Sequence, residues 1–242
     1  MPAILCKSCR APYPPTGMPF RCPQCGGYFD FDSPLTFDSA SIEPDQPGFW
    51  RYRHSFALFP DSPVVSLGEG NTPLVWDRLE GVDIAYKMEA LNPSGSYKDR
   101  NCAVMVSQLL GRGVDLAIED SSGNAGASFA AYAARGGVRA RIYVPETASG
   151  PKRAQIEMFG AELVAVPGPR SEAAKAVLKD AESGVAYASH AYMPFGLPGI
   201  ATLAYELWET LAARPAPSSP RSVTAACCAA CGWALKPCAC AA

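Results

Sequence analysis

Short apolar runs alternate with helix-compatible stretches through the middle of the chain, from about Leu67 to Leu211. Four runs have the length of β-strands: residues 84–88, 116–118, 141–144 and 163–166. Stretches with helical spacing lie at residues 99–110, 124–134, 152–159 and 171–182. Because short strands that alternate with helices build βαβ units, the pattern predicts an α/β fold with a largely parallel sheet and helices on both faces. Ligands bind such sheets at the carboxyl ends of the strands, so we expect the functional site there.

The regions on either side lack this alternation. Residues 1–33 hold four of the ten cysteines and predict a small separate module. Residues 34–66 are rich in proline and aromatic residues, which predicts an ordered connector rather than a flexible linker. Residues 212–242 form an Ala/Cys-rich tail without periodicity. We interpret this tail as the product of a reading-frame shift near Arg214; a second metal site at residues 227–240 and a genuine short paralogue are the alternatives.

Composition and charge narrow the class of protein. The chain of 242 residues is 48% hydrophobic with a net charge of −2, which is typical of a globular protein and gives no reason to expect nucleic acid or an acidic membrane surface as a partner. The first residues lack the apolar stretch of a secretory signal, and no segment is long enough to span a bilayer, so we expect a cytoplasmic protein. In that reducing compartment, cysteines serve as metal ligands or free thiols more often than as disulfides.

Two pairs of cysteines near the N-terminus have the spacing of metal ligands. Cys6 and Cys9 form one CxxC pair, and Cys22 and Cys25 form the other. Each pair fits one tight turn, and two such turns supply the four thiolates that tetrahedral zinc prefers. A module of this size cannot build an adequate core, so a metal would contribute directly to its folding. The pattern predicts a structural zinc site; four free cysteines or two disulfides are the alternatives.

A lysine follows the first predicted strand in a tight loop, residues 92–100 (NPSGSYKDR). Pro93 and Gly95 shape the loop, and Lys98 falls near the N-terminus of the next helix. The helix dipole disfavours a cation there, and a neutral amine is the form that attacks an aldehyde. Taken alone, this pattern does not distinguish Lys98 from an ordinary surface lysine.

A second loop comes directly after the next strand, at residues 121–126 (SSGNAG). Ser121, Ser122 and Asn124, with the backbone N–H groups at the start of a helix, form a site suited to a carboxylate. A simple N-cap by serine or asparagine is the alternative. We expect this loop and the lysine loop to emerge at the same edge of the sheet.

Three linked motifs resemble the threonine synthase family of fold-type II pyridoxal-phosphate (PLP) enzymes. They are the segment 68–74 (GEGNTPL), the lysine loop and the SSGNAG loop, in the order and spacing of that family. The four cysteines followed by residues 49–52 (FWRY) are similar to its zinc-ribbon type. The resemblance covers about residues 1–211. It implies a three-layer PLP-enzyme domain over residues 67–211, incomplete at its C-terminal end.

The resemblance also implies roles for single residues. Lys98 would hold PLP covalently and then move protons as base and acid. Asn124 would lie beside the cofactor ring, while Ser121, Ser122 and Gly123 would hold the substrate carboxylate. The family reaction converts O-phosphohomoserine and water to threonine and phosphate, with PLP as the electron sink. A dimer or a monomer is the assembly that the family suggests.

The sequence departs from the family at its C-terminal end. No glycine-rich loop that would bind the cofactor phosphate is found after residues 197–211. The chain is therefore expected to be a threonine synthase-like lyase, with three alternatives of the same fold: a threonine/serine deaminase, a cysteate synthase or a β-replacement enzyme. A truncated chain without catalysis is the remaining alternative.

Four further residues attract notice without a predicted chemical role. Cys102 lies on the helix after the lysine and is expected to pack in the core, as is Tyr97. His54 and His190 are the two histidines of the chain, and both lie far from the two loops in sequence. Neither is assigned to catalysis.

Overall fold

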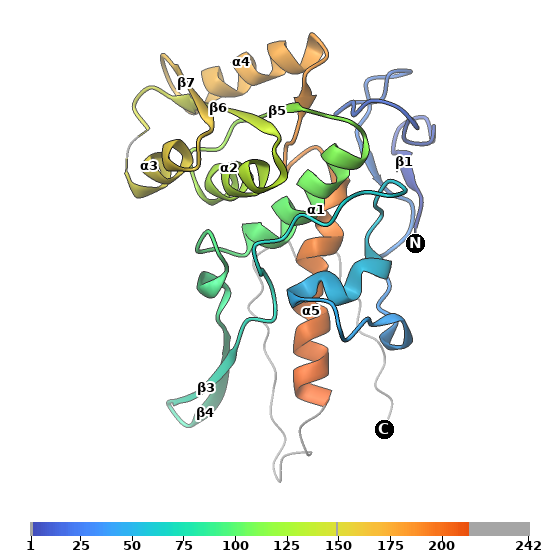
Figure 1. The fold of residues 1–242 in the computed structure, drawn as a ribbon, viewed down its shortest axis with the longest axis vertical. Coiled ribbons are helices and arrows are strands. Elements are labelled where there is room, and N and C mark those ends of the chain that lie inside the picture. Colours follow the sequence, from blue (N-terminus) through green and yellow to red (C-terminus); the bar gives the residue numbers. More distant parts are fainter. Residues whose placement is uncertain (1, 149, 213–242) are drawn as a thin grey trace.

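The computed structural model describes residues 2–148 and 150–212 and has a four-stranded parallel sheet in its upper half (Figure 1). The strand order is β7-β6-β5-β8. The strands are β5 (Leu116–Glu119), β6 (Arg139–Pro145), β7 (Glu162–Val166) and β8 (Ala186–Tyr187). All three pairings are parallel, which confirms the predicted α/β fold.

Helices cover both faces of this sheet, as predicted (Figure 1). The helix α4 (Arg170–Glu182) lies on one face, while α2 (Asn124–Gly136) and α3 (Pro151–Met158) lie on the other. α2 is rich in alanine, and buried Ala127, Ala130 and Ala133 let this helix approach the strands closely. The longer side chains of Phe129 and Tyr132 fill the space beside it.

The helix α1 (Lys98–Gly111) lies between α2 and α5 (Leu197–Ala212). Eleven of its fourteen residues are buried, so it is the central helix of the described chain. Its polar residues are therefore buried as well, and each needs a partner in the interior. Four short 3₁₀ helices complete the helical elements of the described residues: η1 (Ser39–Ser41), η2 (Gly48–Ser55), η3 (Glu89–Leu91) and η4 (Pro194–Gly196).

The strand before the lysine loop does not belong to the parallel sheet, which corrects the expectation that both loops follow strands of one sheet. β4 (Val82–Lys87) pairs antiparallel with β3 (Leu74–Leu79) in a separate hairpin. Its two-residue turn has positive φ at both positions, 50° at Glu80 and 83° at Gly81, which matches the twist of paired strands. Because this tight turn joins the two strands, β4 pairs with β3 and not with a strand of the parallel sheet.

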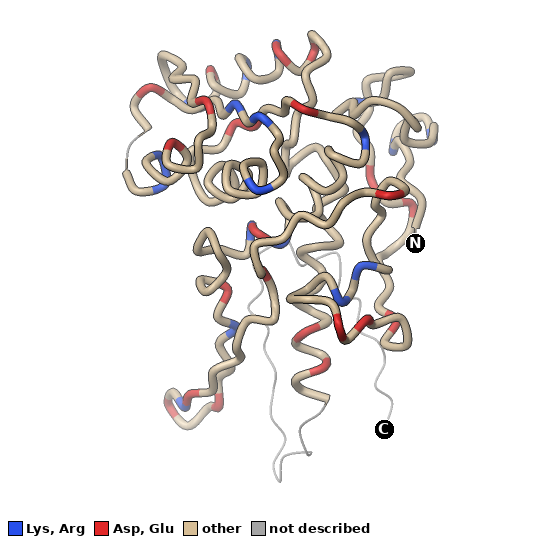
Figure 2. Tube along the Cα trace, viewed as in Figure 1, with Lys and Arg blue, Asp and Glu red and all other residues tan. Residues whose placement is uncertain are grey.

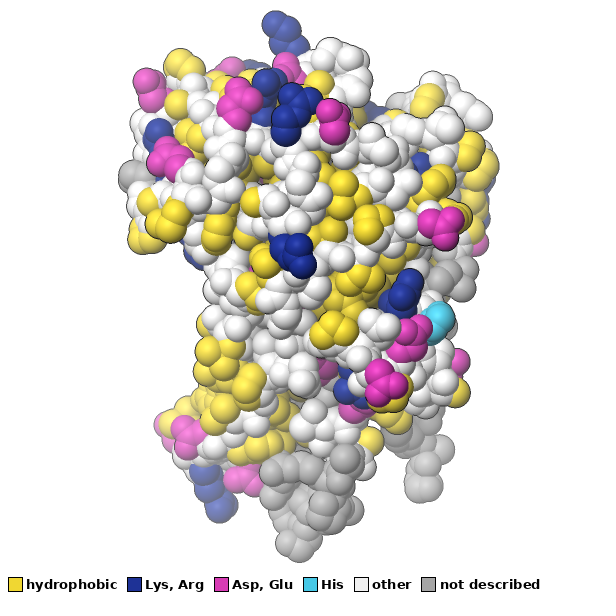
Figure 3. All heavy atoms as spheres, viewed as in Figure 1, with side chains coloured by type: hydrophobic (Ala, Val, Ile, Leu, Met, Phe, Trp, Pro, Cys, Tyr) yellow, Lys and Arg dark blue, Asp and Glu magenta, His cyan; other side chains and the backbone are white. Residues whose placement is uncertain are grey.

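The hairpin projects from the rest of the molecule and exposes apolar side chains (Figures 1 and 3). Val75, Leu79, Val82 and Tyr86 are 48%, 57%, 54% and 45% exposed, respectively. An apolar cluster of this kind on a two-stranded ribbon is an aggregation liability unless something covers it.

The N-terminal residues form a second small sheet, in which β1 (Ile4–Cys6) pairs antiparallel with β2 (Phe29–Phe31). The connector that follows is anchored by Trp50, whose indole N–H donates to Glu69 Oε1 at 2.7 Å. The hydroxyl of Tyr132 on α2 donates to the other oxygen of Glu69 at 2.7 Å. This fully buried carboxylate therefore joins the aromatic connector to α2.

Acidic and basic residues are interspersed over the described chain (Figure 2). In these residues no helix combines the length and the apolar character that crossing a membrane requires. The interpretation of the tail as a frame-shifted segment falls, beyond Ala212, outside the described residues.

Candidate functional site

The lysine loop is a tight turn that leads from η3 into α1. Gly95 has a φ of 85°, and its N–H donates to the carbonyl of Asn92 at 2.8 Å. The side chain of Asn92 accepts from the N–H of Gly70 at 2.9 Å, which joins this loop to the GEGNTPL segment. Lys98 is the first residue of α1, so the lysine lies at a helix start as the sequence predicted.

The Lys98 side chain is left without an ionic partner in the part of the chain that the structure describes. Its Nζ lies 4.9 Å from the centre of the Tyr97 ring. The amines of two other lysines near the site are engaged: Lys87 pairs with Glu206 at 2.6 Å, and Lys152 donates to the carbonyl of Ser94 at 3.0 Å. Lys98 therefore has its amine available for a ligand.

Asp99, the next residue, is fully buried and holds the loop in place. Its carboxylate accepts from the N–H of Ser94 at 2.7 Å and also from the hydroxyl of Ser94. The hydroxyl of Ser128 on α2 donates to it at 2.6 Å. Burial raises the pKa of Asp99, and these hydrogen bonds partly oppose that rise. The backbone that carries Lys98 is therefore fixed from both sides.

In the first turn of α1, the guanidinium of Arg100 is completely buried between two carboxylates. It contacts Glu206 on α5 at 2.7 Å and Glu89 at 2.8 Å. Burial alone would lower the pKa of Arg100, and the bonds to Glu206 and Glu89 outweigh it and raise the pKa. Lys87 also pairs with Glu206, so two cations and two carboxylates lock α1 onto α5 and the hairpin.

The SSGNAG loop forms a turn between β5 and α2. Ser121 is buried, Ser122 and Gly123 are half-buried and Asn124 is exposed. Gly123 is the N-cap of α2 and makes no side-chain capping bond, so the alternative of a simple serine or asparagine cap does not apply. The N–H of Gly123 donates to Oγ of Ser121 at 3.3 Å, so the N–H groups that can bind an anion are those of the first turn, from Asn124 on.

Gly126 brings the helix close to this turn. A Cβ at this position would lie 1.8 Å from the carbonyl oxygen of Ser121, which is closer than any side chain tolerates. Only glycine therefore allows α2 to begin where it does.

The lysine loop and the SSGNAG turn lie side by side because α1 packs on α2. The Asp99–Ser128 bond joins the two helices next to their first turns. One turn after Lys98, Cys102 is buried with its Sγ 3.9 Å from the carbonyl of Ala125. The two predicted loops therefore meet through helix packing rather than through neighbouring strands.

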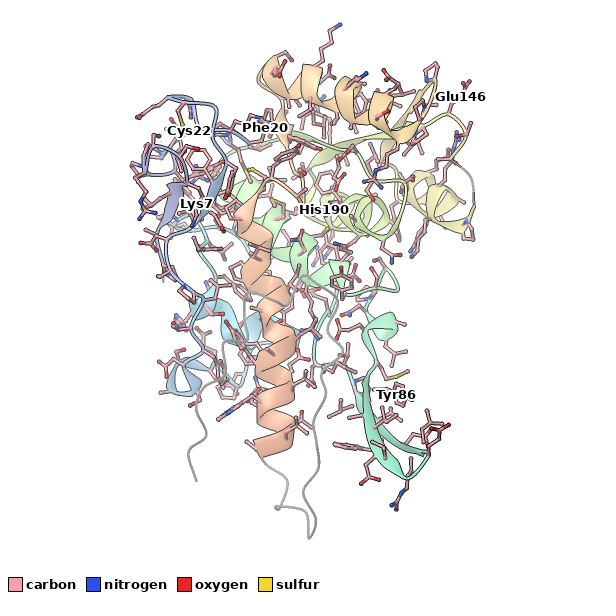
Figure 4. All side chains as sticks on the ribbon, turned by 180° about the vertical axis from the view of Figure 1, so that it is seen from behind. Lys7, Phe20, Cys22, Tyr86, Glu146 and His190 are labelled. Carbon is pink, nitrogen blue, oxygen red and sulfur yellow. The ribbon has the colours of Figure 1, made fainter. Side chains whose placement is uncertain are left out.

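A histidine to which the sequence assigned no role lies at the carboxyl ends of the strands, the edge of the sheet from which the SSGNAG turn also leads (Figure 4). His190, three residues after β8, has its Nδ1 2.8 Å from Oε1 of Glu119, the last residue of β5. Beside this pair, the hydroxyl of Tyr187 donates to Asp120 at 2.7 Å. One signal was present in the sequence: Glu119 ends an apolar strand, and a buried carboxylate needs a partner.

The four N-terminal cysteines converge on one point, and Cys22 is labelled in Figure 4. Their sulfur atoms all lie within 4.8 Å of one another, with 3.5 Å between those of Cys6 and Cys25 and 3.6 Å between those of Cys9 and Cys22. These separations are too long for disulfides. They approach the ~3.8 Å expected between thiolates about 2.3 Å from one tetrahedral zinc.

The two CxxC turns have the same backbone geometry. The N–H of Arg10 donates to the carbonyl of Cys6 at 2.9 Å, and that of Gly26 donates to the carbonyl of Cys22 at 2.8 Å. Arg10 and Gly26 both have positive φ, 64° and 73°. A hydrogen bond from the backbone of Cys9 lowers the pKa of Cys6 to about 6. In Cys9, a backbone bond from Ala11 is outweighed by the bonds to the other sulfurs and by burial, which raise its pKa, so the sulfurs titrate as one group.

A cavity of about 430 Å³ lies at the opposite edge of the sheet, lined by Leu116, Arg139 and Glu162 at the beginnings of their strands. It is therefore remote from the lysine loop and the SSGNAG turn.

Comparison with known proteins agrees with this geometry. The family model "Pyridoxal-phosphate dependent enzyme" matches residues 65–234. A threonine synthase of Methanocaldococcus jannaschii is 34% identical over 218 residues, which cover 85% of this chain and 53% of that protein. A threonine synthase of Bacillus sp. is 38% identical over 160 residues, covering 64% and 45%. The chain thus spans about half the length of the curated relatives it matches.

Solved structures share the fold. A cysteine synthase from Entamoeba histolytica has a TM-score of 0.55 and 28% identity, covering 59% of this chain and 47% of that one. A PLP-dependent aspartate racemase has a TM-score of 0.54 and 28% identity, covering 59% and 46%. These likenesses and the family match confirm the resemblance seen in the motifs. The chain belongs to the family of pyridoxal-phosphate dependent enzymes.

Proposed function

We propose that this chain carries the lysine-bearing part of a threonine synthase-like lyase, which converts O-phosphohomoserine and water to threonine and phosphate. One observation carries the proposal: Lys98 begins α1 with an amine that has no ionic partner among the described residues, beside the uncapped start of α2 at the SSGNAG turn. The identity of 30–39% to threonine synthases from several organisms supports this branch of the family.

The residues present fit the lysine side of a PLP site. Lys98 would hold the cofactor through its Nζ, and Asn124, exposed at the start of α2, would lie beside the ring. The bound cofactor supplies the electron sink for the carbanions of the reaction. Ser121, Ser122 and the N–H groups after Gly123 would bind the substrate carboxylate, because the first turn of α2 is uncapped.

Proton transfer and the positioning of the lysine are assigned to residues of this chain. The Nζ of Lys98 would take the proton from the substrate α-carbon and return it, since it lies at the site without an ionic partner. Asp99, Ser94 and Ser128 hold the lysine loop in one position, so that the proton is moved over a fixed distance.

A deaminase, a cysteate synthase or a β-replacement enzyme would use the same lysine and turn. Structures titled cysteine synthase and O-ureido-L-serine synthase share the fold at 28% and 27% identity. They are compatible with these alternatives without favouring them. The threonine synthase relatives match up to 86% of this chain and therefore favour the lyase.

Addition of PLP to the purified full chain tests the proposal. The wild type is expected to develop the visible absorbance of lysine-bound PLP, and Lys98→Ala is expected to lose it. Lys179→Ala, which removes an exposed lysine on α4, is the matched control and should keep the band. A wild type without the band would favour the non-catalytic alternative. Phosphate and threonine formation from O-phosphohomoserine then separates the lyase from the other reactions.

We also propose that Cys6, Cys9, Cys22 and Cys25 hold a structural zinc ion. The matched turns and the sulfur separations support it. Zinc content of about one per chain, lost in the double variant Cys9→Ser/Cys25→Ser, is the expected result. A cytoplasmic location is part of the same proposal, supported by cysteine sulfurs spaced for a metal rather than for disulfides. The family resemblance supports a homodimer or a monomer.

A further inference from the structure

The pair formed by His190 and Glu119 takes no part in the roles described above. The side chain of Glu119 is 2% exposed and that of His190 is 28% exposed, with 2.8 Å between Oε1 and Nδ1. An imidazole whose Nδ1–H donates to a carboxylate presents Nε2 as an acceptor. Among residues 2–148 and 150–212, no hydrogen-bond partner engages Nε2. A buried carboxylate thus orients a ring whose second nitrogen is accessible.

The pair lies at the point where the strand order in the sheet changes side, with β6 on one side of β5 and β8 on the other. β5 leads through α2 to β6 on one side, whereas β8 lies on the other side of β5 and leads away through η4 to α5. β5 and β8 are neighbours in register, with Ile118 beside Tyr187. The crevice at the carboxyl ends of two such strands is the usual place for a ligand in an open α/β sheet. Glu119 and His190 lie on its two sides.

The same crevice is close to the lysine. The segment after β8 packs closely against α1, because a Cβ on Gly196 would lie 2.0 Å from the side chain of Asn101. Glu119 is the last residue of β5, two positions before Ser121, so the pair adjoins the SSGNAG turn. The packing of α1 on α2, through the Asp99–Ser128 bond, brings the lysine loop to the same place.

The charged and titratable groups around the ring come from the ends of two neighbouring strands. β5 ends with Glu119 and is followed by Asp120, and β8 ends with Tyr187, whose hydroxyl bonds to Asp120. Burial raises the pKa of Glu119, and the bond to His190 opposes that rise. The bond between Nδ1 and Glu119 leaves Nε2 as the ring nitrogen that can accept a proton.

We propose that His190, oriented by Glu119, is a second proton-transfer residue of this site and accepts a proton from the water that adds to the substrate β-carbon. This inference rests on the proposed function. Phosphate leaves from the γ-carbon of O-phosphohomoserine, whereas the hydroxyl of threonine is on the β-carbon. Water must therefore add to an unsaturated amino acid, and a base is required for that addition.

The step balances as the addition of one water molecule. An O–H bond of water breaks and its proton goes to Nε2 of His190. The oxygen forms a bond to the β-carbon, and the electron pair of the α,β double bond moves to the α-carbon, which is then protonated. The proton on Nε2 returns to solvent, since the ring is partly exposed. Glu119 does not touch the substrate and acts as a positioning residue.

Proton NMR of the full chain tests the assignment without turnover, because the protein has two histidines and His54→Gln leaves the ring signal of His190 alone. His54 is 57% exposed and pairs with Glu43, apart from the site. In the PLP-treated chain, L-threonine is expected to shift the His190 signal, whereas L-2-aminobutyrate, which lacks the β-hydroxyl, is not. Equal shifts from both amino acids, or no shift from either, overturn the proposal.

Product analysis supplies the second readout. An unsaturated amino acid that fails to take up water at its β-carbon hydrolyses at the α-carbon to 2-oxobutanoate and ammonium. His190→Gln and Glu119→Gln are expected to lower the ratio of threonine to 2-oxobutanoate, by about 100-fold for His190→Gln, while the PLP absorbance and phosphate release persist. An unchanged ratio at normal phosphate release overturns the assignment and leaves the proposed function standing. Absence of PLP absorbance in the wild type overturns the proposed function itself, and the inference with it.

Discussion

Asp99 accepts a hydrogen bond from Ser128 at 2.6 Å, so the residue beside the lysine is bonded directly to the helix that follows the SSGNAG turn. This contact, between residues 29 positions apart, holds together the two loops that carry the candidate chemistry. The same carboxylate also fixes the loop that precedes Lys98, through the N–H of Ser94. The geometry of the site therefore depends on a fully buried side chain.

Removal of the Asp99 carboxylate should disturb the position of Lys98 more than removal of the Ser128 hydroxyl. Asp99→Ala leaves the N–H and hydroxyl of Ser94 and the hydroxyl of Ser128 without a partner, and is expected to reduce the free energy of unfolding by about 2–4 kcal/mol. Ser128→Ala removes one bond and should reduce it by about 1 kcal/mol. Urea denaturation measures both, and PLP absorbance should fall further in Asp99→Ala. Equal effects of the two substitutions would contradict the central role of Asp99.

The ion pair between Arg100 and Glu206 should dominate the acid stability of the described fold. Glu206→Gln leaves Arg100 buried with reduced compensation, so we expect a loss of about 3–5 kcal/mol at pH 7. The exposed pair of Glu172 and Lys175 provides the control, and Glu172→Gln should change stability by no more than about 0.5 kcal/mol.

The pH dependence of that loss follows from the pKa of Glu206. Burial raises this pKa, but the bonds and charge of Arg100, with the help of Lys87, outweigh burial and lower it below 4.5. A lowered folded-state pKa stabilises the protein above the unfolded value, and this contribution disappears as the pH falls through the folded value. The difference between wild type and Glu206→Gln should therefore shrink below pH 4.5 in urea titrations. A difference that grows on acidification would exclude this explanation.

Gly126 should tolerate no side chain, because a Cβ there would meet the carbonyl of Ser121 at 1.8 Å. Gly126→Ala is expected to reduce stability by about 3 kcal/mol, since backbone must move. Gly123→Ala is the control three residues away: its nearest neighbour would be Ser121 Oγ at 3.9 Å, so a change below about 1 kcal/mol is expected. Thermal unfolding followed by circular dichroism compares the two.

Removal of zinc should unfold the N-terminal module without abolishing the rest of the fold. Chelation is expected to expose residues 4–31, detected as faster amide hydrogen exchange in β1 and β2. Cys102→Ala is the control, because that buried thiol lies outside the cysteine cluster and should leave zinc content unchanged. Exchange rates that stay the same after chelation would argue against a structural metal.

The exposed apolar side chains of the β3–β4 hairpin should limit solubility. Leu79 and Val82 lie opposite each other across the turn, so Leu79→Glu with Val82→Lys replaces an apolar pair by an ion pair. Light scattering should show less aggregation, with PLP absorbance unchanged. Met158→Lys changes another exposed apolar residue, 81% exposed on α3, and is expected to have a smaller effect because it lies outside the hairpin.

Local features of the sequence were sufficient for much of the fold. Helix and strand spacing predicted α1 to α4 and β5 to β7 to within about two residues at their ends, because those segments have clear apolar periodicity. The convergence of the four cysteines was also within reach of sequence, since each CxxC pair is a single turn. The starts of α1 at Lys98 and of α2 at Asn124 follow from loops of fewer than ten residues, whereas the sequence left open whether a serine or an asparagine caps α2.

Contacts between segments far apart in the chain could not be predicted from local sequence patterns. The strand before Lys98 looked like any other strand, and only its pairing with β3 removed it from the parallel sheet. Glu206 and Arg100 lie 106 positions apart, and His190 lies 71 positions from Glu119. Such pairs depend on which helix packs on which and in what register.

By itself the sequence determined the local turns that present Lys98, the serines and the cysteines, because a few neighbouring residues are enough to define a turn. The tertiary structure decided which of these turns lie side by side and brought His190 next to Glu119. The physical reason is that buried polar groups need hydrogen-bond partners in the interior, and which partner lies within reach depends on the packing of the entire domain.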